Sequence, residues 1–164
     1  MVLVEWKKLL GNKRLFLWYN STFMKKKQPF IPSVNSCWNH LSIPELRNKS
    51  FEYYRKNIAG KTVFNLSSGF TVHFSVRGGR KLLKGGNIYS SKAEMVRILP
   101  EIMQSALFNN WGERKSTDKP YVLGYLNFKC KVLFDSQLIH LRIAVQLRKD
   151  GKLYYNHEVN KWKK

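Results

Sequence analysis

Acidic residues are scarce in this chain. Its 164 residues include 10 Asp and Glu against 30 Lys and Arg, which gives a net charge of +20. Residues 53–93 contain no acid at all but eight cations. The scarcity argues against a two-metal site, and no paired set of carboxylates suggests one. The surplus of cations favours a polyanionic partner, bound through phosphate contacts and counterion release, although cations that merely keep the surface soluble are the simpler alternative.

Cysteines and long apolar runs are also few. Cys37 and Cys130 are the two cysteines, and they lack the spacing of zinc ligands. We interpret them as free thiols in a reducing compartment, with Cys130 filling the core. No stretch approaches the ~20 apolar residues of a membrane span. The glycine-bounded residues 78–86 lack the Gly-Lys-Ser/Thr ending of a phosphate-binding P-loop. We therefore expect a cytoplasmic protein with no metal, no cofactor and no membrane contact.

The apolar content of 43% is enough for one substantial core. Residues 1–40 read as a basic N-terminal arm or extension, and residues 41–164 as one α+β domain. A first helix begins at a capping box of Ser42 and Glu45 and ends at Gly60. A short strand at 61–66 follows it.

A second helix is predicted over residues 91–109. Ser91 and Glu94 form another capping box at its start. Apolar residues then recur at the spacing of a helix packed on a core. Pro100 should kink this helix or split it in two. Residues 109–112 would end it, and a polar loop would follow.

Alternating apolar residues predict an antiparallel meander over 125–134, 138–148 and 153–159, with Asp150-Gly151 marking a tight turn. The apolar strand faces must meet the apolar helix faces. The predicted fold class is therefore α+β with two layers, in which helices pack on one face of an antiparallel sheet of four to five strands.

The opposite sheet face is predicted to be polar and basic. Residues 69–77 read as a strand whose one side carries Thr71, His73, Ser75 and Arg77. That strand runs into the glycine-bounded residues 78–86, read as a basic loop. A basic, hydroxyl-bearing strand that leads into a basic loop suits the binding of a phosphodiester.

RNA cleavage by its own 2′-hydroxyl needs a base, cations for the charged phosphorane and a proton for the leaving oxygen. The residues that we predict to be catalytic are His73, Arg77, Lys81, Arg142 and Tyr154. Those that we predict to bind RNA are Arg80, Lys84, Lys92, Lys129, Lys131, His140 and Arg148. For the two histidines, a solvated surface position is the competing interpretation.

The chain from about residue 43 to 159 resembles the third of the large polyvalent protein-associated domains of phages and conjugative elements. The resemblance rests on six short segments, at residues 59–62, 69–75, 81–92, 98–102, 124–128 and 154–158. The order of elements is also similar to that of the barnase, EndoU, colicin and RelE-like nuclease group. That similarity implies a sheet face that cleaves RNA without metal.

Together these features suggest a metal-independent RNA endonuclease, acting as a toxin or effector of a phage or mobile element. One alternative is a nucleic-acid-binding or protein-interaction module without catalysis. Another is an inhibitor of host defence that uses its basic face against an acidic protein. RNA is the expected partner, and an acidic antidote or host protein is a further candidate. Convergence of His73 with its predicted neighbours would separate the first interpretation from the others.

Overall fold

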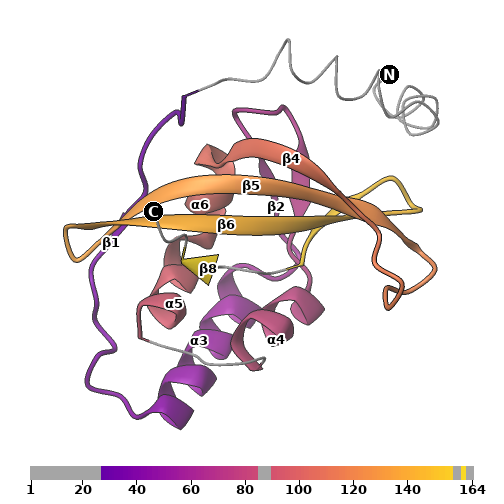
Figure 1. Cartoon of the computed structure of the whole chain (residues 1–164). Coiled ribbons are helices and arrows are strands. Elements are labelled where there is room, and N and C mark those ends of the chain that lie inside the picture. The colour runs from indigo at the N-terminus through magenta and orange to yellow at the C-terminus, as the bar shows by residue number, and fades with distance from the viewer. Residues whose placement is uncertain (1–26, 85–89, 157–159, 162–164) are drawn as a thin grey trace.

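The computed structural model describes residues 27–84, 90–156 and 160–161 (Figure 1). Its centre is a long antiparallel hairpin of β5 (Val122–Phe134) and β6 (Gln137–Arg148). The turn between them uses Asp135 and Ser136, whose φ angles of 46° and 64° suit the twist of a tight hairpin. In Figure 1 the helices α3, α4 and α5 lie below this hairpin, so they cover one face of the sheet.

Six shorter strands complete the sheet. They are β1 (Ser33–Val34), β2 (Thr62–Phe64), β3 (Thr71–His73), β4 (Leu107–Glu113), β7 (Leu153–Tyr155) and β8 (Asn160–Lys161). The main strand order is β1-β5-β6-β7-β3-β2, while β4 also pairs with β5 and β8 also pairs with β6. Each long strand thus has two short neighbours placed one after the other along the same edge.

The predicted fold class is wrong about the sheet. The sheet has eight strands, it is curled, and it is mixed rather than antiparallel. β1 runs parallel to β5, and β3 runs parallel to β7. Three strands were not predicted: β1, β4 and β8. Ser33–Val34 lies within the stretch read as an arm, and Leu107–Glu113 was read as a helix end followed by a loop. The predicted domain boundary at residue 40 stays a prediction.

The first helix is confirmed. α3 (Ile43–Asn57) begins with the predicted capping box, in which Ser42 and Glu45 satisfy each other's backbone groups. Leu46, Tyr54 and Ile58 are buried, so one face of the helix packs into the core. The helical region ends at Gly60, whose φ of 84° suits glycine.

The second helical region is split at the predicted proline. It consists of α5 (Ser90–Met95), the 3₁₀ turn η1 (Val96–Ile98) and α6 (Leu99–Ser105), and Pro100 lies in the first turn of α6. The capping box predicted at Ser91 is wrong. Glu94 is fully buried and instead accepts hydrogen bonds from the backbone amides of Cys37 and Trp38 and from Arg97. This carboxylate ties the segment before α3 to the helix layer.

The predicted strand over 69–77 is also too long, and residues 78–84 of the predicted loop are helical. β3 ends at His73, and α4 (Val76–Lys84) begins shortly afterwards. Ser75 caps α4, because its hydroxyl accepts a hydrogen bond from the Gly78 amide at 3.1 Å. Ser75 and Arg77 therefore belong to the start of a helix and not to the polar row of a strand.

The core lies between the sheet and the helices. The alternation predicted for β5 and β6 is confirmed, with one side of each strand buried. Both cysteines are free thiols, and Cys130 is buried as predicted. Throughout the described residues, no helix is long and apolar enough to cross a membrane. Residues 1–26, 85–89, 157–159 and 162–164 lie outside the described residues, and with them the last two residues of the predicted loop.

Candidate functional site

The sheet face that points away from the helices is here called the outer face. Residues that are directly opposed in neighbouring strands lie on the same face of a sheet. The register of the strands therefore shows which residues belong to the outer face. It carries Tyr125, Asn127, Lys129 and Lys131 of β5, His140, Arg142, Ala144, Gln146 and Arg148 of β6, Tyr154 of β7 and His73 of β3. One row crosses four strands at the same height, from Tyr125 through Gln146 and Tyr154 to His73.

A chain of side-chain contacts runs along one end of the outer face. The rings of His73 and Tyr154 lie 5.6 Å apart between centroids. The Arg148 guanidinium lies 3.9 Å from the centre of the Tyr154 ring and 5.3 Å from that of Tyr121. The Tyr121 hydroxyl accepts a hydrogen bond from Arg77 Nη1 at 3.1 Å. We call these five residues the tyrosine–arginine cluster.

One carboxylate and one amide bond directly to the cluster, and a second carboxylate bonds the neighbouring Tyr125. Asp150 accepts a hydrogen bond from the Tyr154 hydroxyl at 2.8 Å, and Asp118 accepts one from the Tyr125 hydroxyl at 2.6 Å. Gln146 accepts a hydrogen bond from Arg148 Nε at 2.8 Å. The two acids at this end are therefore engaged by tyrosines, while Arg77 is exposed and the half-buried Arg148 guanidinium contacts the Tyr154 and Tyr121 rings.

The surroundings of His73 and Tyr154 shift their pKa values in opposite directions. Partial burial lowers the pKa of His73, and the nearby Lys152 lowers it further, whereas Asp150 acts against the shift. The hydrogen bond to Asp150 raises the pKa of Tyr154, as does its partial burial. At neutral pH the imidazole is thus a neutral proton acceptor, and the phenol keeps its proton on the hydrogen bond to Asp150.

The structure brings together only part of the predicted catalytic set. His73 and Tyr154 are in contact, and Arg77 joins them through Tyr121 and Arg148. Lys81 lies on α4, where its Nζ donates to Asn156 Oδ1 at 2.9 Å. Arg142 is exposed and lies four residues along β6 from Gln146, which corresponds to roughly 13 Å.

The predicted RNA-binding residues also divide into groups. Arg148 belongs to the cluster. Lys129 pairs with Arg142, and Lys131 pairs with His140, farther along the outer face. Arg80 is exposed on α4, and Lys84 ends that helix. Lys92 is only 8% exposed, in α5. Its predicted contact with RNA would require that side chain to become accessible.

Sequence reasoning missed Tyr121, Asp118 and Asp150 as parts of this end of the molecule. Tyr121 precedes β5 and Asp150 lies in the turn after β6, so strand alternation assigned no face to either. Asp150 lies four residues before Tyr154 across a tight turn. That spacing is the one feature of the sequence that could have indicated their contact.

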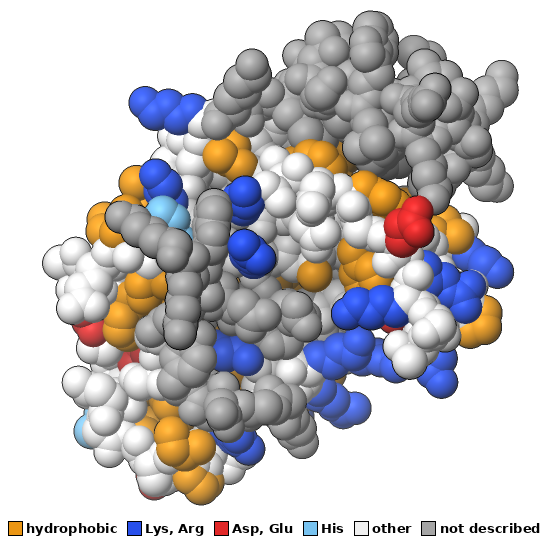
Figure 2. All heavy atoms as spheres, viewed as in Figure 1, with side chains coloured by type: hydrophobic (Ala, Val, Ile, Leu, Met, Phe, Trp, Pro, Cys, Tyr) orange, Lys and Arg blue, Asp and Glu red, His pale blue; other side chains and the backbone are white. Residues whose placement is uncertain are grey.

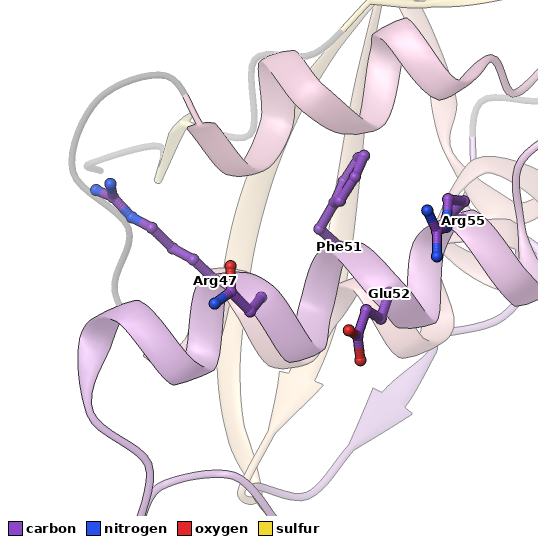
Figure 3. A pocket seen from close by; sticks show the side chains of 5 residues that line it. Arg47, Phe51, Glu52 and Arg55 are labelled. Atoms are coloured by element: carbon purple, nitrogen blue, oxygen red, sulfur yellow. The ribbon is translucent and has the colours of Figure 1, made fainter.

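A second surface feature lies elsewhere. A hollow of about 510 Å³ is lined by Arg47, Asn48, Phe51, Glu52 and Arg55, all from α3 (Figure 3). None of these residues comes from the sheet, so the hollow is separate from the outer face. Its polar lining is shared between two cations and one acid.

The arrangement on the outer face is suited to nucleic acid. Partly exposed tyrosine rings alternate with guanidinium groups, and such surfaces stack bases while the cations bind phosphates. Figure 2 shows Lys and Arg side chains distributed over the visible face, with few Asp or Glu among them. A neutral imidazole beside the rings adds one group that can accept a proton.

The comparison with protein families identifies the class of the chain. Residues 42–155 match the family model described as large polyvalent protein-associated domain 3, and this match covers more than half of the chain. The chain belongs to this family, which is a domain of polyvalent proteins of phages and mobile elements. No curated protein and no solved structure matched the chain.

Proposed function

We propose that this domain binds RNA on its outer face and cleaves it without metal at the tyrosine–arginine cluster. The observation that carries the proposal is the contact between His73, Tyr154 and Arg148. It combines a proton acceptor, a flat ring and a guanidinium within one surface patch. These are the groups that bind a nucleotide and activate its 2′-hydroxyl.

In the proposed reaction, neutral His73 accepts the proton of the 2′-hydroxyl, and the 2′ oxygen attacks the adjacent phosphorus. Arg148 and Arg77 stabilise the charge that develops on the phosphorane oxygens. The bond from phosphorus to the 5′ oxygen then breaks, and that oxygen takes a proton from solvent. The products are a 2′,3′-cyclic phosphate and a free 5′-hydroxyl. Tyr154 is a positioning residue in this reaction, because its ring contacts both Arg148 and His73 and its hydroxyl already donates to Asp150.

One observation favours a second candidate, an RNA-binding module without catalysis. The other described histidine of this face, His140, pairs with Lys131 on β5 and lies farther along the sheet than His73. Within the part of the chain that the structure describes, no second histidine therefore lies beside His73 to protonate the leaving oxygen. In this candidate the cluster serves only to bind RNA.

The test is incubation of the full chain with total RNA in EDTA, followed by mapping of the new ends. The proposal predicts ends with a 2′,3′-cyclic phosphate. His73→Ala should lower the cleavage rate at least ~100-fold, the usual contribution of a general base, while leaving RNA affinity nearly unchanged. His40→Ala is the matched control, since His40 is exposed just before α3 and lies outside the cluster.

Each result decides between the candidates. Cleavage that His73→Ala does not reduce would show that His73 is a surface histidine and that the proposed site is wrong. Binding without cleavage would leave the second candidate. Absence of both binding and cleavage would overturn the proposed function.

A further inference from the structure

Residues 28–38 lie along the side of the domain as a bound peptide would. In Figure 1 this indigo segment runs in an extended path from the edge of the sheet towards α3. Most of its residues are exposed or half-buried, and the three buried ones are Pro32, Val34 and Trp38. Buried side chains at alternate positions, with exposed ones between them, are typical of a peptide that adds a strand to a sheet edge.

The end of β5 holds the middle of this segment through backbone hydrogen bonds. β1 pairs in parallel with the last two residues of β5. The Leu133 amide donates to the Pro32 carbonyl at 2.9 Å, and the Asp135 amide donates to the Val34 carbonyl at 3.2 Å. Main-chain bonds of this kind give affinity for any extended backbone, so specificity has to come from side chains.

The Gln28 side chain supplies one specific contact. Its Nε2 donates to the Lys131 carbonyl at 2.9 Å, and its Oε1 accepts a hydrogen bond from the Lys131 amide at 2.8 Å. The same Nε2 lies 3.3 Å from Ser105 Oγ. The amide of Gln28 thus binds one backbone position of β5 from both of its polar atoms.

A buried carboxylate and an aromatic pocket supply the contacts at the other end of the segment. Glu94 accepts hydrogen bonds from the backbone amides of Cys37 and Trp38. The Trp38 ring meets Tyr53 edge to face, with centroids 6.1 Å apart, and Arg97 lies 5.6 Å from its centre. Glu94 also pairs with Arg97 at 2.9 Å, so its charge would keep a partner after the segment left.

We infer that this groove is a binding site for an extended peptide, and that residues 28–38 are a releasable ligand that fills it within the same chain. The groove consists of the end of β5, Glu94 and the pocket around Trp38. Its ligand presents a glutamine and, ten residues later, a tryptophan. The groove lies at the opposite end of β5 from the tyrosine–arginine cluster, so the inference does not depend on the proposed function.

Hydrogen exchange of the full chain tests the release in the unmodified protein. The amides of Cys37, Trp38, Leu133 and Asp135 donate across the boundary between segment and groove. If the segment opens as a unit, these amides should share one protection factor that is lower than that of the β5–β6 hairpin. Protection equal to that of the hairpin would overturn the inference, because the segment would then be a fixed part of the core.

A labelled peptide of residues 27–41, added in trans, tests the groove. Val34→Asp in the full chain should release the segment, since the new carboxylate would be buried. The matched control is Ser33→Asp, which places the same carboxylate on the exposed neighbouring residue of β1. By fluorescence anisotropy the peptide should bind Val34→Asp saturably. It should bind Ser33→Asp and the parent at least ~10-fold more weakly, because their own segment competes at an effective concentration on the order of mM.

The same peptide with Trp38→Ala should bind the Val34→Asp chain at least ~10-fold more weakly, as expected for a buried tryptophan anchor. Circular dichroism shows whether Val34→Asp is folded. No binding of the peptide to folded Val34→Asp, or equal binding to Val34→Asp and Ser33→Asp, would overturn the inference. If Val34→Asp does not fold, the exchange experiment on the parent decides by itself.

Discussion

At the scale of single residues, the chemistry of the outer face depends on the protonation of His73. Partial burial and Lys152 both lower its pKa, and Asp150 opposes them. A histidine that acts as a base is active in its neutral form, so cleavage should rise with pH and level off above the His73 pKa. Because that pKa is lowered, the midpoint of the rise should lie below the 6.5 of an ordinary histidine.

Titration of the His73 ring protons by NMR checks this directly. We expect a midpoint below 6.5, the ordinary value for histidine. Lys152→Ala should move the midpoint upward, because it removes a cation that disfavours the imidazolium. Asp150→Asn should move it downward. Lys149→Ala, which changes an exposed lysine of the same turn, should leave it unchanged. A midpoint that Lys152→Ala leaves in place would show that this electrostatic explanation of His73 is wrong.

The residues of the cluster were predictable to different degrees. Strand alternation placed His73, Arg148 and Tyr154 on one face, because the period of two is a property of the extended backbone. Alternation assigns no face to Tyr121, since its position depends on how the chain enters β5. The spacing between Arg142 and His73 depends on register and strand order, which the local sequence does not fix.

At the scale of elements, the close packing of α4 on α3 shapes the region beside the site. Gly79 of α4 lies against the Tyr54 ring, and a Cβ built at Gly79 would come within 2.4 Å of Tyr54 Cδ1. The Tyr54 hydroxyl also donates to the Ser75 carbonyl at 2.9 Å, at the start of α4. Gly79 therefore permits this approach of the helices, while a Cβ at Gly78 would come within 2.7 Å of the Tyr155 carbonyl of β7.

The sign of the stability change caused by Gly79→Ala tests this packing. In an open helix this change stabilises by about 1 kcal/mol, because alanine has the better helix propensity. Here we expect a lower free energy of unfolding in urea, since the added methyl group meets the buried Tyr54 ring. Arg80→Ala, at the exposed neighbouring position, should have little effect. A Gly79→Ala chain more stable than the parent would contradict the packing of α4 on α3.

The packing of α4 into the core also explains why its residues were predicted to form a loop. Glycines and lysines in residues 78–86 indicate a loop by local propensity, but residues 78–84 are helical because the buried Leu82 and Leu83 pack into the core. β4 was missed for a related reason. Its Asn109-Asn110 pair reads as a helix end, whereas pairing with β5 holds it extended through a bulge.

At the scale of the whole molecule, the net charge of +20 alone predicts attraction to any polyanion. The proposed function claims more, namely that binding is concentrated at the outer face. There, β5 and β6 contain no acid, and the two carboxylates near the cluster are engaged by tyrosines. Removal of one charge from the cluster should therefore weaken RNA binding more than removal of one charge from the helix layer.

The affinity of single-stranded RNA for Arg148→Ala and for Arg55→Ala, measured at one salt concentration, tests this claim most directly. The two variants remove the same charge from different sides of the core, and their thermal unfolding serves as a check on folding. We expect Arg148→Ala to weaken binding several-fold more than Arg55→Ala, because it removes a cation that the proposal places against the phosphate. Equal effects of the two substitutions would contradict the claim, because they would show diffuse electrostatic binding without a site on the outer face.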